Sequence, residues 1–109
     1  MVKVTVLDGP GKGLINEFPQ VLIIGRGSES DMQIESPSLS RKHAMISIHG
    51  STVILEDLNS TNGITVGGKK VDKAKLADGG EFTAGDSVFR VNINAAQDIQ
   101  YTRILKAKR

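Results

Sequence analysis

Two short polar segments, residues 36–42 and 58–62, carry the side chains best suited to bind an anion. Their hydroxyl, amide and guanidinium groups belong to Ser38, Ser40, Arg41, Asn59, Ser60, Thr61 and Asn62. Arginine can form paired, charge-assisted hydrogen bonds to a phosphate, and hydroxyl and amide groups can satisfy the remaining oxygens. Neither segment contains a carboxylate, although Asp57 directly precedes the second. The same residue types also form ordinary turns, so composition alone leaves both interpretations open.

The sequence lacks the patterns that a catalytic or metal site needs. The absence of cysteine excludes disulfides, thiolate metal sites and cysteine nucleophiles. The glycine-rich run 9–13 has no Ser or Thr after its lysine, which a P-loop requires, and no nucleophile-elbow motif occurs. His43 and His49, the only histidines, lie six positions apart and form a poor metal pair. We therefore expect a non-enzymatic protein with no metal and no cofactor.

The charge distribution argues against nucleic acid and membranes as partners. Residues 1–98 hold ten basic and twelve acidic residues, whereas residues 99–109 add four basic residues and no acid. The main body is thus not basic, as a nucleic-acid binder would be. A run of four lysines within residues 69–75 has no interleaved aromatics for base stacking, which favours a solvated strand edge. No stretch approaches the roughly 20 apolar residues of a membrane span, so we expect no membrane insertion and a cytoplasmic location.

Alternating apolar and polar residues predict many short strands that would position these segments. The expected strands span residues 2–6, 14–18, 21–24, 32–34, 43–49, 52–57, 64–66, 69–71, 81–83 and 87–94. Glycine-rich turns separate several of them, and no convincing helical stripe occurs in the first 94 residues. Short strands with glycine-rich turns indicate an all-β sandwich or barrel.

One hairpin can be predicted in register. If Gly50 and Ser51 form a two-residue type II′ turn, Ile46 lies opposite Leu55 and Ile48 opposite Val53, which gives one continuous apolar face. A slip of one residue would destroy that face. Continued beyond the strand ends, the same register brings Ser40 opposite Thr61, so the two polar segments meet at one end of the hairpin. The register does not place Arg26.

Three motifs in order carry a resemblance to a known family. They are Gly25-Arg26 at the end of a buried strand, Ser40-Arg41-Lys42-His43-Ala44, and Asp57-Leu58-Asn59-Ser60-Thr61-Asn62-Gly63. Together they resemble the forkhead-associated (FHA) domain family over roughly residues 2–94. The resemblance implies an all-β, FHA-type β-sandwich of about eleven short, mostly antiparallel strands, whose apical loops bind phosphothreonine peptides. It also implies an FHA domain at residues 1–94, followed at 95–109 by a basic C-terminal tail or the start of a linker.

The resemblance assigns a phosphopeptide-binding role to five residues. Arg26 is similar to the family's phosphate-binding arginine, and Ser40 to the serine whose hydroxyl bonds the phosphate. Arg41 occupies the next loop position, where family members often add a phosphate or peptide contact. Thr61 matches the residue that lines the phosphothreonine pocket, and Asn62 the asparagine that bonds the peptide main chain.

Four further residues are expected to support the site. His43 resembles the family's buried histidine that holds the loop of Ser40 in shape. Gly63 is expected to adopt a positive φ, and Asn59 to form a turn and make no ligand contact. Gly25 belongs to the motif that ends the buried strand.

The family membership implied here predicts a phosphothreonine-dependent interaction module in signalling downstream of Ser/Thr kinases. Its partner would be a phosphothreonine-containing protein, either the kinase or a kinase substrate. The alternative is an FHA fold used as a phosphate-independent scaffold in a bacterial secretion or multidomain regulatory assembly. Thr102, beside Arg103 in the basic tail, is either a kinase target or an unmodified threonine near a chain end.

Overall fold

The structure, a computed structural model, describes residues 1–93, which form eleven strands and no helix. The strands are β1 (Val2–Asp8), β2 (Ile15–Phe18), β3 (Val21–Gly25), β4 (Met32–Gln33), β5 (Ala44–His49), β6 (Thr52–Asp57), β7 (Ile64–Val66), β8 (Lys69–Val71), β9 (Lys73–Leu76), β10 (Glu81–Ala84) and β11 (Ser87–Ile93). The proposed tail at 95–109, including Thr102, lies outside the described residues. No helix in the described part of the chain could cross a membrane.

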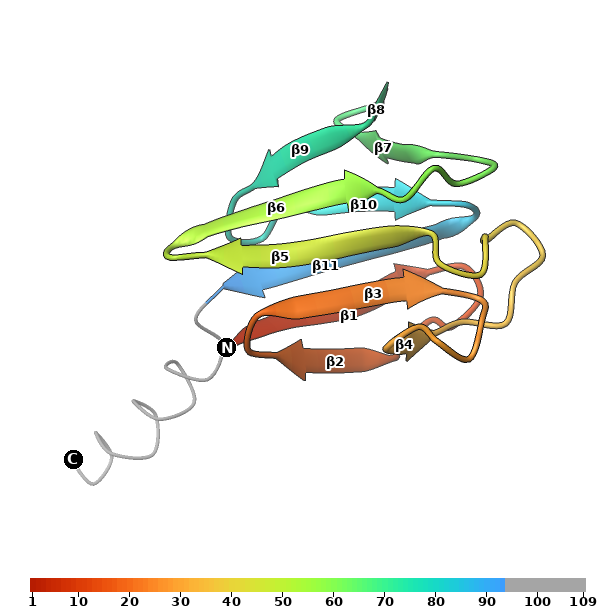
Figure 1. Ribbon diagram of the computed structural model, residues 1–109, viewed down its shortest axis with the longest axis horizontal. Coiled ribbons are helices and arrows are strands. Elements are labelled where there is room, and N and C mark those ends of the chain that lie inside the picture. Colours follow the sequence, from red (N-terminus) through yellow and green to blue (C-terminus); the bar gives the residue numbers. More distant parts are fainter. Residues whose placement is uncertain (94–109) are drawn as a thin grey trace.

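The strands form two sheets that pack face to face (Figure 1). One sheet has the order β2-β1-β11-β10-β7-β8, and the other has the order β4-β3-β5-β6-β9. Every pairing is antiparallel except β3 with β4. The prediction of an all-β sandwich with about eleven, mostly antiparallel strands is therefore confirmed.

The core lies between the two sheets and consists mainly of aliphatic side chains. Along β1, Val2, Val4 and Val6 are buried and alternate with half-exposed neighbours, as expected for a strand with one face on the core. Phe82 of β10 and Phe89 of β11 stack across the sheet with ring centroids 4.8 Å apart. Burial of each large apolar side chain contributes roughly 1.5–3 kcal/mol, so the sheets form a firm platform for the loops at their ends.

The predicted hairpin is confirmed in its register. Strands β5 and β6 pair Ile46 with Leu55 and Ile48 with Val53, and Gly50 has the positive φ of 67° that a type II′ turn requires at its first position. The two apolar residues that face each other in the first pair, Ile46 and Leu55, are fully buried. The hairpin therefore holds the segments before and after it in a fixed relation.

One strand, β9, was missing from the prediction. It pairs with β6, but of its four residues only Leu76 is buried, and Lys73 and Lys75 are exposed. A single buried residue in an edge strand leaves too little alternation to recognise. The prediction of a lysine-rich edge is confirmed, because the lysines lie on β8 and β9, which are edge strands of the two sheets.

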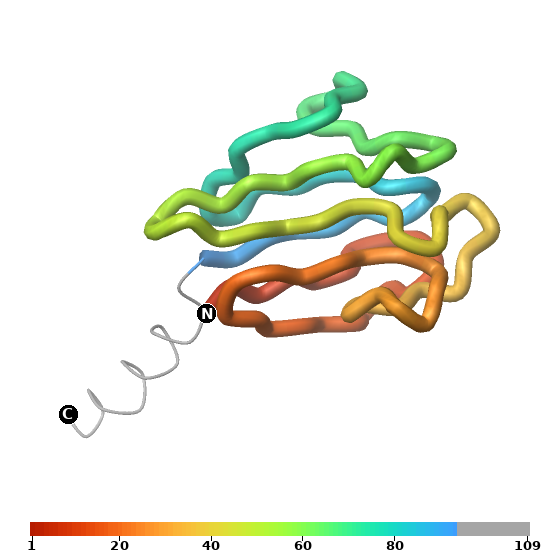
Figure 2. Tube along the Cα trace, viewed as in Figure 1, coloured from red at the N-terminus to blue at the C-terminus, as the bar shows by residue number. Residues whose placement is uncertain are grey.

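The parallel pairing of β3 and β4 explains how Arg26 reaches the same end of the sandwich as Ser40. Ile24 pairs with Met32, so both strands run toward the same end, and the loops that follow them both emerge there. Figure 2 shows the chain looping back after β3 before it continues into the next long loop. We call this end of the sandwich the apical end.

Candidate functional site

Three loops converge at the apical end, after β3, before β5 and after β6 (Figure 1). The Arg26 backbone N–H donates to the Ser40 carbonyl (2.9 Å), and the Thr61 N–H donates to the Ser40 hydroxyl oxygen (3.0 Å). The Asn62 side-chain amide donates to the Ser38 carbonyl (2.8 Å). A cleft of about 430 Å³ opens between the loops and is lined by Arg26, Pro37, Ser38, Leu39, Ser40, Arg41, Lys42, Thr61 and Asn62. All five residues assigned to phosphopeptide binding thus line one cleft.

The Arg26 guanidinium is held in place from one side. Its Nε donates to the Leu39 carbonyl at 3.0 Å, and the residue is otherwise exposed. Within residues 1–93 it has no carboxylate partner. The two terminal nitrogens therefore remain available for a bidentate bond to an anion, with their orientation already restricted.

The Ser40 hydroxyl uses one of its three hydrogen-bonding positions. Its oxygen accepts the Thr61 N–H, which leaves its own proton free to donate. A phosphate oxygen in the cleft can accept that proton, because phosphate oxygens are acceptors.

His43 connects the loop before β5 to the loop after β6. Its Nδ1 accepts the Ser40 N–H (3.0 Å), so in the neutral ring Nε2 carries the proton and donates to the Gly63 carbonyl (2.8 Å). The side chain is fully buried. Gly63 has a φ of 78°, the left-handed conformation that glycine adopts readily.

Gly25 allows a close approach between the end of β3 and the backbone of Arg41. A Cβ at Gly25 would lie 2.2 Å from the Arg41 carbonyl oxygen and 2.6 Å from the Ser30 hydroxyl. The Arg41 carbonyl also accepts hydrogen bonds from the Ser30 hydroxyl (2.6 Å) and the Gly27 N–H (3.0 Å). Any larger residue at position 25 would push the Ser40 loop away from Arg26.

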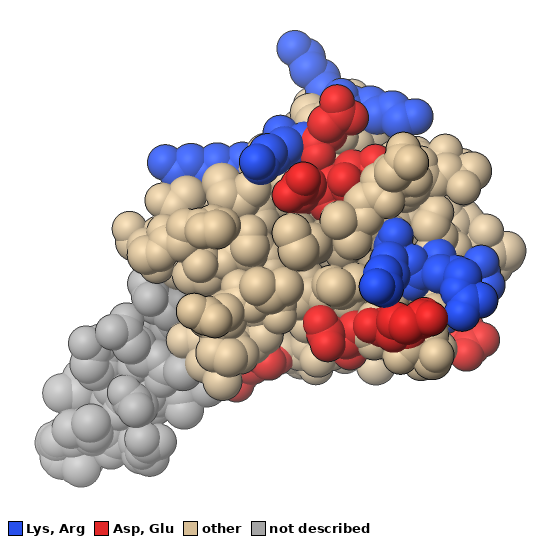
Figure 3. All heavy atoms as spheres, viewed as in Figure 1, with Lys and Arg blue, Asp and Glu red and all other residues tan. Residues whose placement is uncertain are grey.

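The Arg41 side chain is paired with a carboxylate that the sequence did not indicate. Its guanidinium lies 3.4 Å from Glu29, and both side chains are well exposed. A hydrogen bond from its own backbone, and then the neighbouring Arg41, hold the pKa of Glu29 below its ordinary value. Figure 3 shows basic and acidic side chains side by side at this end of the molecule. Such exposed pairs are weak, so Arg41 can exchange Glu29 for another anion.

A second group of residues braces the Ser40 loop against the other sheet. The Ser36 and Ser38 hydroxyls donate to one carboxylate oxygen of Asp86, at 2.9 and 2.6 Å, and the Asp86 N–H donates to the Ser38 hydroxyl oxygen (3.1 Å). Hydrogen bonds from Ser38 and then Ser36 lower the pKa of Asp86. Ser38 was predicted as a free donor, but its hydroxyl is used within the protein.

The Ser60 hydroxyl is also used within its own loop. It bonds to the Asp57 carboxylate and accepts the Gly63 N–H at 2.8 Å. Asn59 has a φ of 58°, the left-handed conformation of a turn residue. The loop after β6 thus presents Thr61 and Asn62 to the cleft and keeps Ser60 for its own turn.

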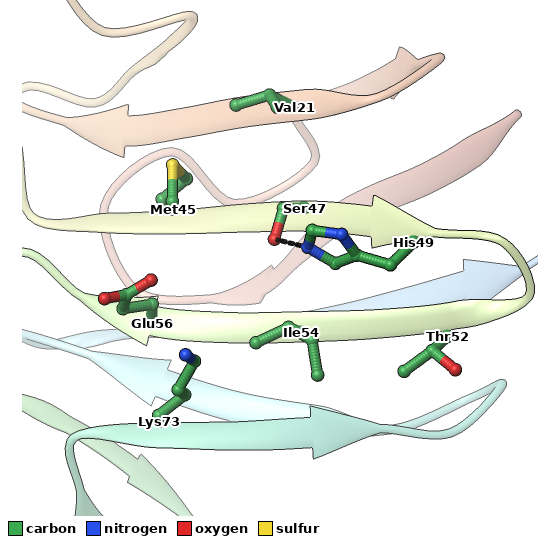
Figure 4. Close-up of a pocket in the computed structure, with 8 residues that line it drawn as sticks. All are labelled: Val21, Met45, Ser47, His49, Thr52, Ile54, Glu56 and Lys73. Carbon is green, nitrogen blue, oxygen red and sulfur yellow. Dashed lines mark hydrogen bonds between the residues drawn. The ribbon is translucent and has the colours of Figure 1, made fainter.

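A larger hollow of about 690 Å³ lies on the outer face of the five-stranded sheet (Figure 4). It is lined by Val21, Met45, Ser47, His49, Thr52, Ile54, Glu56 and Lys73. His49 bonds only to Ser47 there, at 3.0 Å. The hollow is lined by no arginine, and its one lysine, Lys73, lies opposite the Glu56 carboxylate in the β6–β9 pair, so it suits a phosphate less well than the apical cleft does. No cluster of potential metal ligands occurs within residues 1–93.

Comparison with known proteins establishes the class of protein. The family model of the FHA domain matches residues 22–85, more than half of the chain. The chain belongs to the FHA domain family.

Individual relatives agree with this classification. The FHA domain-containing protein FhaA of Mycobacterium tuberculosis is 39% identical over 72 residues, which cover 66% of this chain and 14% of FhaA. The solved FhaA FHA domain, complexed with the intracellular domain of a second protein, is similar with a TM-score of 0.76 and 34% identity, covering 84% of this chain and 100% of that one. A structure from a study of phosphothreonine-dependent FHA domain interactions has a TM-score of 0.73 and 35% identity, covering 84% and 95% of the two chains. The chain thus spans only a small part of the full-length relative.

Proposed function

We propose that the apical cleft binds phosphothreonine-containing peptides and that the domain is a phosphothreonine-dependent interaction module in Ser/Thr-kinase signalling. The observation that carries this proposal is the convergence of Arg26, Ser40 and Thr61 from three separate loops. The Arg26 guanidinium and the Ser40 hydroxyl each have free hydrogen-bond donors. A related FHA structure concerned with phosphothreonine-dependent interactions supports the same ligand class.

Each residue of the cleft has a distinct part in the proposed complex. Arg26 forms two charge-assisted bonds to the phosphate, and Ser40 donates a third. Thr61 lines the pocket for the phosphothreonine side chain. The Asn62 amide nitrogen is held by Ser38, which leaves its oxygen to accept an N–H from the peptide backbone. Arg41 leaves Glu29 to contact the phosphate or the peptide.

The proposed partner is a protein phosphorylated on threonine, either a Ser/Thr kinase or a kinase substrate. The domain acts by binding, not by catalysis, in a cytoplasmic setting. We place its limits at residues 1–94 and regard 95–109 as a basic tail or linker. The buried supports Gly25, His43 and Gly63, with the turn at Asn59, hold the binding loops in shape.

Calorimetric titration with phosphothreonine, phosphoserine and unphosphorylated peptide pools tests the proposal. We expect saturable binding only to the phosphothreonine pool. Replacement of Arg26→Ala should weaken it by more than about tenfold, since each hydrogen bond to a charged group contributes roughly 1.5–3 kcal/mol. The matched control is Arg90→Ala, which removes an exposed arginine that pairs with Glu81 on the other sheet. Equal binding of unphosphorylated peptides, or unchanged affinity in the folded Arg26→Ala variant, would contradict the proposal.

A further inference from the structure

A lysine from outside the apical loops lies against Gly63, the residue that follows Asn62 of the cleft lining. Lys70 lies on the edge strand β8, opposite Thr65 of β7. A Cβ at Gly63 would lie 2.3 Å from Lys70 Cε and 3.3 Å from its Nζ. The lysine side chain therefore extends along the sheet and lies directly over Gly63, the residue after Asn62.

Two features of the strand pair fix this position. Lys70 lies directly opposite Thr65 in the antiparallel β7–β8 pair, so these two side chains share one face of the sheet. The missing side chain at Gly63 provides the space that the lysine occupies. Lys69, its neighbour in β8, lies opposite Val66, one position farther along β7 from the apical loops, and points to the other face.

The Lys70 ammonium group is available to a ligand. The residue is exposed, and it forms no ion pair with any carboxylate of residues 1–93. Its neighbour across Gly63, Asn62, lines the cleft and is the residue proposed to hold the peptide backbone. Lys70 therefore places a positive charge without an ion-pair partner in residues 1–93 beside the residue that follows Asn62.

We propose that Lys70 selects phosphothreonine peptides that carry a second anionic group, a carboxylate or a further phosphate, on the segment that crosses Asn62. This inference rests on the proposed function, because it needs the phosphothreonine to occupy the cleft. The attraction between the ammonium and the anion stabilises the complex, and the exposure of Lys70 limits the gain to that of a surface pair, roughly two- to fivefold in affinity. The gain falls as salt is added, because salt screens exposed charges.

The test measures the affinity of phosphothreonine peptides in which each other position in turn carries Gln, Glu or phosphoserine. We expect one position, or two adjacent ones, at which Glu or phosphoserine binds more tightly than Gln. Comparison of the Glu and phosphoserine peptides separates the two sources of negative charge. The gain should disappear in Lys70→Gln and remain in Lys69→Gln, which removes the same charge from the same strand on its other face. In Lys70→Glu, a peptide with Lys at that position should regain affinity.

Two results would overturn the inference, and only the second would also overturn the proposed function. If phosphothreonine peptides bind and Arg26→Ala abolishes binding, but Lys70→Gln preserves the preference or no preference exists, the inference about Lys70 is wrong and the proposed function stands. If no phosphothreonine peptide binds the folded protein, the proposed function and the inference fail together.

Discussion

At the scale of single residues, some side chains at the cleft keep free hydrogen-bond donors, whereas others use their donors within the protein. Arg26 uses Nε on Leu39 and keeps its terminal nitrogens, and Ser40 accepts one hydrogen bond and keeps its proton. Ser38 and Ser60 lie close by, but their hydroxyls bond to Asp86 and Asp57. The free donors therefore belong to the residues proposed to bind phosphate, and the engaged ones hold the loops.

His43 supports the binding loops but does not line the cleft, so its replacement tests loop support without removing a proposed ligand contact. Replacement of His43→Phe keeps the volume but leaves the half-buried Ser40 N–H and the buried Gly63 carbonyl without their partners. Each unsatisfied buried group costs about 1–3 kcal/mol, so we expect urea denaturation to show a loss of about 2–4 kcal/mol in the free energy of unfolding. Phosphopeptide affinity should also fall, because the Ser40 loop loses its anchor.

The matched control for this variant is His49→Phe. His49 is exposed and bonds only to Ser47 on the outer face. Its replacement should change the free energy of unfolding by no more than about 0.5 kcal/mol and leave phosphopeptide affinity unchanged. Equal destabilisation by the two substitutions would refute the supporting role of His43.

At the scale of elements, the apical loops are held by both sheets. The Ser40 loop bonds to the loop after β3 through Gly27 and Ser30, and to the turn between β10 and β11 through Asp86. A Cβ at Gly85 in that turn would lie 2.7 Å from the Ser38 hydroxyl, so a glycine is needed for the close approach. The brace thus connects the cleft to the sheet that does not itself contribute Arg26.

The Asp86 brace should depend on pH. Because its hydrogen bonds lower the pKa of Asp86 in the folded state, the carboxylate stabilises the fold above the ordinary carboxyl range, near pH 4. This contribution to stability is lost as the pH falls through the lowered pKa of Asp86 in the folded state. We expect the difference in unfolding free energy between the wild type and Asp86→Asn to be largest at pH 7 and to shrink as the pH falls. Urea denaturation over that range measures it.

The control uses the donors to this carboxylate. In a Ser36→Ala, Ser38→Ala background, Asp86→Asn should show a much smaller pH-dependent difference, because the groups that lower the pKa are gone. A difference that persists unchanged in that background would show that another interaction causes it.

The sequence predicted those elements whose pattern is local. The β5–β6 hairpin followed from alternation and a glycine turn, and it correctly brought Ser40 to Thr61. The position of Arg26 did not follow, because the parallel pairing that redirects the chain involves a strand of only two residues, β4. Strand β9 was missed because a single buried residue leaves no pattern.

The sequence also could not show which polar residues have hydrogen-bonding groups free for a ligand and which use them to hold the loops. Ser38 and Ser40 have the same chemistry and lie two positions apart, and only the three-dimensional placement of Asp86 engages one of them. The same holds for Lys69 and Lys70, because the space over Gly63 accommodates only the side chain of Lys70.

At the scale of the whole molecule, the cleft and the described chain ends lie at opposite ends of the sandwich (Figure 1). Val2 pairs with Ile93 at one end, and the loops that carry Arg26, Ser40 and Thr61 meet at the other. The outer hollow occupies a third surface, the exposed face of the five-stranded sheet. A peptide bound in the cleft and a protein bound on the outer face would therefore contact different residues.

The most direct test of phosphothreonine binding in the apical cleft is a map of backbone amide chemical shifts during titration with the phosphothreonine pool. We expect the largest changes at the amides of Arg26, Ser40, Thr61 and Asn62, and almost none at Ser47 of the outer face. The unphosphorylated pool should move none of them. Changes confined to the outer face, with unmoved apical amides, would contradict the account and favour a phosphate-independent scaffold.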